Sequence, residues 1–286
     1  MRDFVIYTDS SADISPEILN EWGISYTSLT FRFSDSEREF SNSDMEIGEF
    51  YGKMREGGVA KTAAVNSESF LEAFKSALDG GLDVLYIGFS SGLSTTYNSA
   101  RIAMEELKGE YPESKLIAVD TLAASAGVTL LLDLVLAKQK AGASIEEAAS
   151  YAEEMKLHIA HWFTVDDLVY LQRGGRVSGA AAFVGNLLGI KPVLHVDNDG
   201  HLVPVTKVRG RHASIAAMAD RLGDGILEGS SVYISHSDAR ADAEKLSGII
   251  ESKYGYKTSL ITDVGPVIGA HSGPGTIALF FVAKER

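Results

Sequence analysis

The amino-acid sequence predicts a two-domain α/β protein, with a parallel-sheet α/β/α domain first and a mixed or antiparallel-sheet α+β domain second. Three observations predict this fold class. Short apolar runs alternate with helical patterns in the first half, the second half changes to strands paired around a tight turn, and 286 residues exceed one ordinary core. We place the boundary near residue 156, so the predicted domains are residues 1–156 and 157–286.

The first domain is predicted to alternate strands and helices in chain order. A strand over residues 4–8 precedes Ser15 and Pro16, a helix cap and first-turn pair. A strand run at 24–33, helices near 46–55 and 67–79, and a strand at 84–89 follow. A helix near 96–108, a strand at 116–120 and a helix at 124–140 complete the pattern. Such an order predicts a parallel sheet covered on both faces, with ligands bound at the carboxyl ends of its strands.

The second domain has a different order of predicted strands and helices. After a helix at roughly 144–158, a short strand begins at Trp162, a helix ends at residues 174–175, and an alanine-rich helix starts at Ser178. Two strands then flank the turn at residues 197–200, whose Asp-Asn-Asp-Gly composition supplies left-handed backbone positions and favours antiparallel pairing. We find no internal repeat and no low-complexity linker.

Composition excludes several classes of function. A hydrophobic fraction of 45% with 23% charged residues is typical of a globular protein, and the net charge of −13 argues against a nucleic-acid partner. Without cysteine there is no disulfide, thiolate metal site or cysteine nucleophile. The longest apolar run, residues 128–137, contains Asp133 and is too short for a membrane span. The start lacks a signal-peptide pattern, so we expect a cytoplasmic protein.

Residues 88–92 match the Gly-x-Ser-x-Gly pattern directly after a predicted strand. This is the setting of a hydrolase nucleophile, so one alternative is a serine esterase that uses Ser90 with His271 as its base. Against this alternative, only two strands precede Ser90, no glycine-rich oxyanion loop lies upstream, and no third triad member is evident.

The same segment is also a candidate anion-binding site. Residues 90–97 carry five Ser and Thr side chains where a strand ends and a helix begins, and a helix N-terminus binds anions through its free amides. Ser91, Ser94 and Thr95 are the candidate ligands, with helix capping as the alternative role. His271 lies in a predicted Gly/Pro-rich loop over residues 265–276, and its imidazole suits a carboxylate.

Other polar residues are given structural roles. Asp9 and Asp13 follow the first strand, where a turn is favoured over a Mg²⁺ site. His158 and His161 are predicted on one helical face, but they lack a third zinc ligand. No nucleotide-binding fingerprint occurs, so a nucleotide-binding role has no local support. We expect neither a metal nor a cofactor.

Taken together, the motifs resemble the DegV family of bacterial fatty-acid-binding proteins. The likeness extends over nearly the whole chain, through residues 8–13, 61–62, 90–97, 119–121, 174–178, 191–192 and the His271 loop. Two stretches depart from the family pattern, Thr62-Ala63-Ala64-Val65-Asn66 and Leu93-Ser94-Thr95-Thr96, although Thr62 and Ser94 themselves are kept.

The resemblance implies a carrier that does not act as an enzyme alone. It would bury a long-chain fatty acid and present the carboxylate to the ATP-dependent catalytic subunit of a fatty acid kinase, which makes an acyl phosphate. By the same analogy, Thr62 and Ser94 hydrogen-bond the carboxylate and His271 completes the network. Arg173, Arg176 and Arg209 would face the kinase. We expect residues 178–185 and 123–132 to line the acyl tunnel, with ordinary core packing as the alternative.

Overall fold

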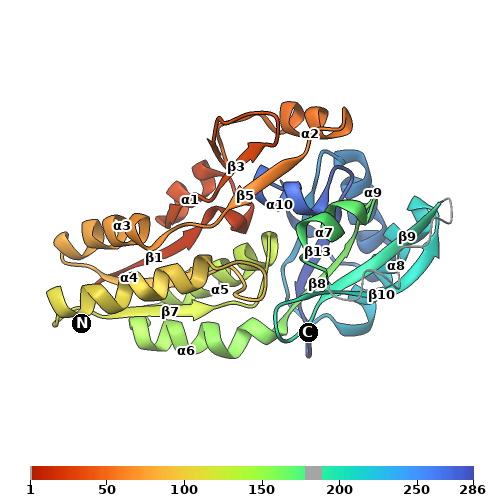
Figure 1. Ribbon diagram of the computed structural model, residues 1–286. Helices are drawn as coiled ribbons and strands as arrows, with labels where there is room; N and C mark the ends of the chain where they lie inside the picture. Colours follow the sequence, from red (N-terminus) through yellow and green to blue (C-terminus); the bar gives the residue numbers. More distant parts are fainter. Residues whose placement is uncertain (1, 178–188) are drawn as a thin grey trace.

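The computed structural model describes residues 2–177 and 189–286, and it confirms the predicted α/β fold class (Figure 1). A parallel sheet and its helices form the N-terminal part, and a larger mixed sheet forms the C-terminal part. The predicted alanine-rich helix from Ser178 lies outside the described residues. The domain boundary near residue 156 stays a prediction.

The N-terminal sheet has four parallel strands in the order β2-β1-β6-β7, over Ser25–Thr27, Phe4–Asp9, Asp83–Gly88 and Leu116–Asp120. Side chains of β6 alternate between two cores. Val84 and Tyr86 pack against α3 (Ser67–Asp79) and α4 (Thr96–Glu110). Leu85 and Ile87 pack against α5 (Ala126–Lys140) and α6 (Ile145–Met155). All six β6 residues are buried, as expected for a central strand covered on both faces.

The predicted single strand at 24–33 is wrong, because the chain forms two strands in different sheets. After β2, the Ser10 hydroxyl accepts a hydrogen bond from the Leu29 amide at 3.0 Å, and the chain turns. The second strand, β3 (Thr30–Phe33), joins a small antiparallel sheet with β4 (Phe40–Ser41) and β5 (Ala60–Ala63). Helix α2 (Ile47–Arg55) covers this sheet. Strands of two to four residues leave too little periodicity in the sequence to predict them.

The C-terminal sheet has six strands in the order β10-β9-β8-β13-β11-β12. They span Leu202–Arg209, Ile190–Val196, Ile159–Thr164, Ile277–Val282, Val232–His236 and Thr258–Asp263, and only the β11–β12 pair is parallel. The hairpin predicted around residues 197–200 is confirmed as the antiparallel β9–β10 pair.

Helices cover both faces of the C-terminal sheet. Helices α8 (Arg211–Gly225) and α9 (Arg240–Tyr254) pack on one face, and α5 packs on the other while it also covers the N-terminal sheet. Asp133, which interrupts the apolar run of α5, accepts a hydrogen bond from the Tyr233 hydroxyl at 2.9 Å. Helix α5 is therefore a shared core element that joins the two sheets.

The shorter elements complete the chain. They are the 3-10 turns η1 (Ser10–Ala12) and η2 (Lys156–His158), and the helices α1 (Pro16–Trp22), α7 (Val169–Gly174) and α10 (Pro266–Ser272). The Ser15 hydroxyl caps α1 by accepting from the Ile18 amide, as the Ser-Pro pair predicts. Helix α10 packs against β3 and β5 although it belongs to the C-terminal end of the chain (Figure 1).

Two histidine placements differ from the sequence predictions. His158 lies in η2 and His161 in β8, so the two do not share a helical face. His271 lies in the last turn of α10, where a loop was predicted, since Pro266 at the first helical position starts a helix. In the ranges 2–177 and 189–286, no helix is both long enough and apolar enough to cross a membrane.

The Arg286 guanidinium joins segments that are far apart in the sequence. It donates to the backbone carbonyls of Leu122 at 2.6 Å and Lys156 at 2.7 Å, and to three further carbonyls, those of Thr121, Ile159 and Asp197. Burial lowers the pKa of Arg286 to about 10. This side chain therefore connects the end of β7, the start of β8 and the β9–β10 hairpin.

Candidate functional site

A cavity of about 450 Å³, here called the first cavity, lies where the small sheet, α10 and the C-terminal sheet meet. Its walls are mainly apolar. Four hydroxyl side chains and one imidazole that the sequence singled out also line it: Thr62, Ser91, Ser94, Thr95 and His271. The structure thus brings together residues from β5, the turn before α4, and α10.

Thr62 and His271 form the polar centre of this group. The Thr62 Oγ1 lies 2.8 Å from the His271 Nε2, although 209 positions separate the two residues in sequence. The antiparallel pairing of β5 with β3 holds Thr62, and the packing of α10 on both strands holds His271. A Cβ atom on Gly174 would lie 2.3 Å from the His271 Nδ1, so the close approach of α7 to the ring requires glycine.

His271 is held as a neutral imidazole. Burial lowers its pKa to about 4, and the nearby Arg176 charge adds to this effect. The His271 Nδ1 is buried without a hydrogen-bond partner, so Nε2 makes the ring's contact to protein at this position. The pair of Thr62 and His271 is therefore a neutral cluster that can donate hydrogen bonds to an anion.

The hydroxyl turn before α4 supplies the second polar wall. Ser94 Oγ lies 2.9 Å from Thr96 Oγ1 and accepts from the Thr96 amide at 3.2 Å, while Thr95 makes no capping bond with its side chain. Ser91 and Thr95 are exposed, and Ser94 is half-buried. Ser94 therefore lies deeper in the first cavity, and Ser91 and Thr95 lie at its rim.

Polar residues that the sequence analysis did not assign to the carboxylate site also line the first cavity. The Ser125 and Ser235 hydroxyls are 2.9 Å apart, and His161 Nε2 accepts from the Ala124 amide at 3.3 Å. His161 Nδ1 lies 2.8 Å from the Ile159 carbonyl, and burial lowers the pKa of this ring well below its usual value. Of the predicted tunnel segment 123–132, only Ala124 and Ser125 line the first cavity. Helical spacing alone does not distinguish these residues from core.

Ser90 has a structural role and does not line the first cavity. The side chain is fully buried, and its Oγ donates to the Gly200 carbonyl at 2.9 Å at the tip of the β9–β10 hairpin. A nucleophile must reach substrate and a base, whereas this hydroxyl is enclosed between two loops. The Gly-x-Ser-x-Gly match is thus a strand-to-turn connection, and the geometry offers the esterase alternative no support.

The three arginines fall in different places. Arg176 lines the first cavity and donates from Nε to the Leu93 carbonyl at 3.3 Å. Arg173 is exposed on α7 with its guanidinium 5.8 Å from the centre of the Tyr170 ring. Arg209 ends β10, at the opposite end of that strand from the cavity-lining Leu202.

The first aspartate of the N-terminal motif acts as a turn residue. Asp9 accepts hydrogen bonds from the Ser11 amide, the Tyr86 hydroxyl and the Phe89 amide, and it also contacts the Ser11 hydroxyl. These bonds satisfy both carboxylate oxygens and join η1 to the end of β6. The turn interpretation of Asp9 therefore agrees with its contacts.

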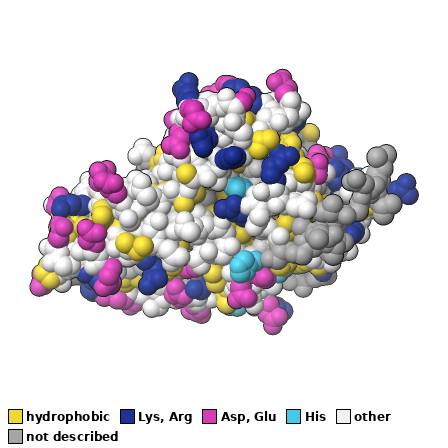
Figure 2. All heavy atoms as spheres, viewed as in Figure 1, with side chains coloured by type: hydrophobic (Ala, Val, Ile, Leu, Met, Phe, Trp, Pro, Cys, Tyr) yellow, Lys and Arg dark blue, Asp and Glu magenta, His cyan; other side chains and the backbone are white. Residues whose placement is uncertain are grey.

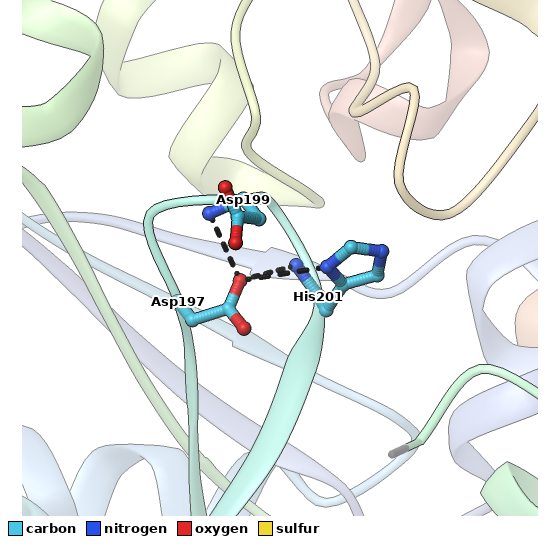
Figure 3. Close-up of side chains that lie close together, drawn as sticks. All are labelled: Asp197, Asp199 and His201. Atoms are coloured by element: carbon cyan, nitrogen blue, oxygen red, sulfur yellow. Dashed lines mark hydrogen bonds and ion pairs between the residues drawn. The ribbon is translucent and has the colours of Figure 1, made fainter.

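Figure 3 shows Asp197, Asp199 and His201 at the tip of the β9–β10 hairpin. In the part of the chain that the structure describes, this is the one trio whose carboxylate or imidazole atoms lie close enough to share a metal ion. The Asp197 Oδ1 accepts from the amides of Asp199 at 3.0 Å and His201 at 2.8 Å. These bonds account for the cluster as a hairpin turn.

The His271 pKa predicts an acid-sensitive fold. Between pH 6.5 and pH 4 the unfolded chain takes up a proton at residue 271 while the folded protein does not, so the free energy of unfolding falls as pH decreases. The contribution, fully present above pH 6.5, is at most about 3 kcal/mol. Urea unfolding at pH 7 and pH 4.5 should show that the free energy of unfolding falls less in His271→Gln than in wild type over this pH range. Equal losses in both would contradict a neutral, buried imidazole.

The fold and the first cavity define the class: a two-domain α/β protein with an amphipathic internal cavity whose polar end combines hydroxyls with a neutral imidazole. The chain belongs to the DegV family. A family model described as "Uncharacterised protein, DegV family" matches residues 3–284.

Relatives match the chain over nearly its full length. A DegV domain-containing protein of Clostridium perfringens is 42% identical over 290 residues, which cover 100% of this chain and 99% of the relative. A Thermotoga maritima structure described as revealing fatty acid binding function has a TM-score of 0.85 at 31% identity, covering 99% and 100% of the two chains. A fatty-acid-binding DegV family protein of Thermus thermophilus has a TM-score of 0.87 at 28% identity, with the same coverage.

Proposed function

We propose that this protein is a cytoplasmic carrier that binds a long-chain fatty acid in the first cavity and presents its carboxylate to a partner kinase. Thr62, Ser94 and His271 hold the carboxylate, with Ser91 and Thr95 at the rim. The observation that carries the proposal is the division of one cavity into apolar walls and a hydroxyl–imidazole end. The fatty acid binding named for the Thermotoga and Thermus relatives supports the same ligand class.

The apolar walls provide the binding free energy. Burial of an acyl chain contributes about 0.8 kcal/mol per CH₂ group, so ten buried methylenes contribute roughly 8 kcal/mol before the cost of ordering the chain. A cavity of about 450 Å³ falls within the usual range of small-molecule pockets. Its apolar lining includes Leu29, Phe89, Leu171, Val267, Ala278 and Phe280.

The polar end of the first cavity supplies the hydrogen-bond donors that a buried carboxylate needs. A carboxylate in a low-dielectric site is strongly disfavoured unless donors meet it. When the His271 Nε2–H donates to the Thr62 Oγ1, the Thr62 hydroxyl proton is free to donate to the ligand. Ser94 supplies a second hydroxyl. A bound anion also favours the protonated imidazole, so the ligand raises the pKa of His271 from its low value.

Presentation requires that one carboxylate oxygen stays reachable from the rim. That oxygen attacks the γ-phosphorus of ATP held by the kinase, the bond to ADP breaks, and an acyl phosphate forms on this carrier. Figure 2 shows Lys and Arg side chains gathered around a histidine near the middle of one face. Arg173 and Arg176 are exposed and suit an acidic partner surface, and Arg209 is a further exposed arginine that would contact the partner.

Native mass spectrometry tests the proposal. The purified protein should carry one additional mass that disappears on denaturation and equals that of a fatty acid. After delipidation, palmitate should bind, and methyl palmitate should bind more weakly and remain intact, because it has no carboxylate for Thr62 and Ser94. Protein that neither retains lipid nor takes up palmitate would contradict the proposal, and hydrolysis of the ester would favour an esterase.

The kinase step is tested on the same palmitate-loaded protein. With ATP and the matching kinase subunit, hydroxylamine should trap an acyl phosphate. The Arg173→Ala variant should keep its palmitate and lose transfer, because Arg173 is exposed and does not line the first cavity. Transfer at the wild-type rate in this variant would remove Arg173 from the partner surface.

A further inference from the structure

A second cavity, of about 390 Å³, lies apart from the first at the seam between the N-terminal part and the β12–α10 connection. Five acidic residues line it, and no lysine or arginine of the described chain does so. Those acidic residues are Asp9, Asp13, Glu17, Glu46 and Asp263. A cavity walled by one sign of charge focuses a negative potential, which favours a cationic occupant.

Asp13 is the most buried polar group of this cavity that lacks a full set of partners. Its side chain is 5% exposed, Oδ1 accepts from the Gly265 amide at 2.9 Å, and Oδ2 has no hydrogen-bond partner. A buried carboxylate oxygen without a donor is costly. Burial raises the pKa of Asp13 to about 8, although the nearby Ser125 hydroxyl and the Gly265 amide lower it, and the charges of Asp263 and Asp9 raise it further. Among the described residues that line the cavity, no lysine or arginine compensates this carboxyl.

The remaining lining identifies the shape of the occupant. Glu17, Glu46 and Asp263 are exposed at the rim, whereas Asp13 is buried at the floor. The walls also include apolar side chains, namely Ile14, Leu19, Tyr26, Met45 and Ile47. Acidic groups at the floor and at the rim of a partly apolar cavity match an alkyl chain with an ammonium group at each end, because a bound ammonium favours the ionised form of Asp13.

A bare metal ion fits this lining less well. Among residues 2–177 and 189–286, the only three acidic or histidine ligand atoms within 4.8 Å of one another belong to the β9–β10 hairpin tip, so the carboxylates here are too dispersed to chelate an ion. An ammonium needs only one carboxylate with hydroxyl or carbonyl acceptors around it. The volume also matches a small molecule.

We propose that the second cavity binds a small linear diamine, with one ammonium on Asp13 at the floor and the other among the rim carboxylates. This site is independent of the fatty-acid cavity, and its failure would leave the lipid proposal untouched. The ammonium donates to the Asp13 Oδ2, the alkyl segment lies on the apolar walls, and the rim provides long-range attraction for the second charge.

Calorimetric titration of the full chain with putrescine, at pH 8 and 0.15 M salt, tests the site. Putrescine should bind saturably, and butylamine should bind at least fivefold more weakly. MgCl₂ should show no saturable binding. Asp13→Asn should weaken putrescine at least tenfold, since asparagine tolerates the left-handed backbone of residue 13 and keeps an acceptor for Gly265. Glu46→Gln should weaken it a few-fold. Glu113→Gln, an equal charge change at an exposed residue outside the cavity, should have no effect.

Several outcomes would overturn this proposal. One is the absence of saturable putrescine binding, and another is wild-type affinity for putrescine in Asp13→Asn. A loss of putrescine affinity in Glu113→Gln as large as that in Glu46→Gln, or butylamine binding as tight as putrescine binding, would also overturn it. Saturable Mg²⁺ binding that displaces putrescine would reassign the cavity to an inorganic cation. Thermal unfolding of each variant confirms that it is folded, and palmitate uptake measured in parallel reports on the first cavity separately.

Discussion

Replacing Thr62 with alanine should weaken fatty-acid binding by about ten- to a hundredfold. A hydrogen bond to a charged group contributes about 1.5–3 kcal/mol, and every 1.4 kcal/mol changes the affinity tenfold. The loss is expected because Thr62 is one of the two hydroxyls that we propose to hold the carboxylate, and it contacts His271 at 2.8 Å. Ser94→Ala should have an effect of the same order. Titration of delipidated protein with palmitate measures both.

Two matched variants make this result interpretable. Thr62→Ser keeps the hydroxyl and should bind palmitate nearly as wild type does, so it separates the hydrogen bond from a general disturbance of β5. Ser252→Ala removes a hydroxyl from the exposed face of α9 and should leave the palmitate affinity unchanged. If Thr62→Ala and Ser94→Ala both retain palmitate at wild-type affinity while folded, the carboxylate does not lie where we place it.

Replacing Arg286 with alanine should lower the free energy of unfolding by about 3–4 kcal/mol, because buried carbonyl oxygens lose their donor. Five backbone carbonyls accept from this one guanidinium. A planar fork of five donors can satisfy them together, and a lysine ammonium cannot. Arg286→Lys should therefore recover only part of the loss. Urea unfolding at pH 7 measures these differences.

Arg240→Ala is the control for this experiment. Arg240 is exposed and makes an ion pair with Glu244 one helical turn away, so its removal should cost less than about 0.5 kcal/mol. A loss in Arg286→Ala no larger than in Arg240→Ala would show that the carbonyls find other donors. Because Arg286 also contacts the hairpin tip through the Asp197 carbonyl, the destabilised variant should retain palmitate less well at 37 °C.

Local chemistry explains which parts of the fold were predictable. The Ser15–Pro16 start of α1, the six-residue β6 and the turn at residues 197–200 each carry a signal in adjacent residues, and each is observed. The division of residues 24–33 into two strands has no such signal, since it depends on the Ser10 hydroxyl, which lies outside that run.

The candidate site divides in the same way. Ser94 and His271 were singled out from their sequence neighbourhoods or from a family resemblance, and both line the first cavity. Ser90 has the stronger motif but is buried against Gly200, which is 110 positions away. His161 was predicted on a helical face with no part in the site, yet it lies in a strand and is buried in the cavity wall. In each case the outcome depended on a partner remote in sequence.

By itself, the sequence determined the α/β class, the exclusion of cysteine chemistry, the hydroxyl-rich turn and the family. Only the tertiary structure decided that Thr62 meets His271, that Ser90 is a hairpin contact, and that Asp13 lies unpaired in a second, acidic cavity. The physical reason is the distance along the sequence over which each kind of interaction acts. Capping, turn chemistry and hydrophobic periodicity act over a few residues, whereas burial and the meeting of polar groups depend on how whole sheets and helices pack.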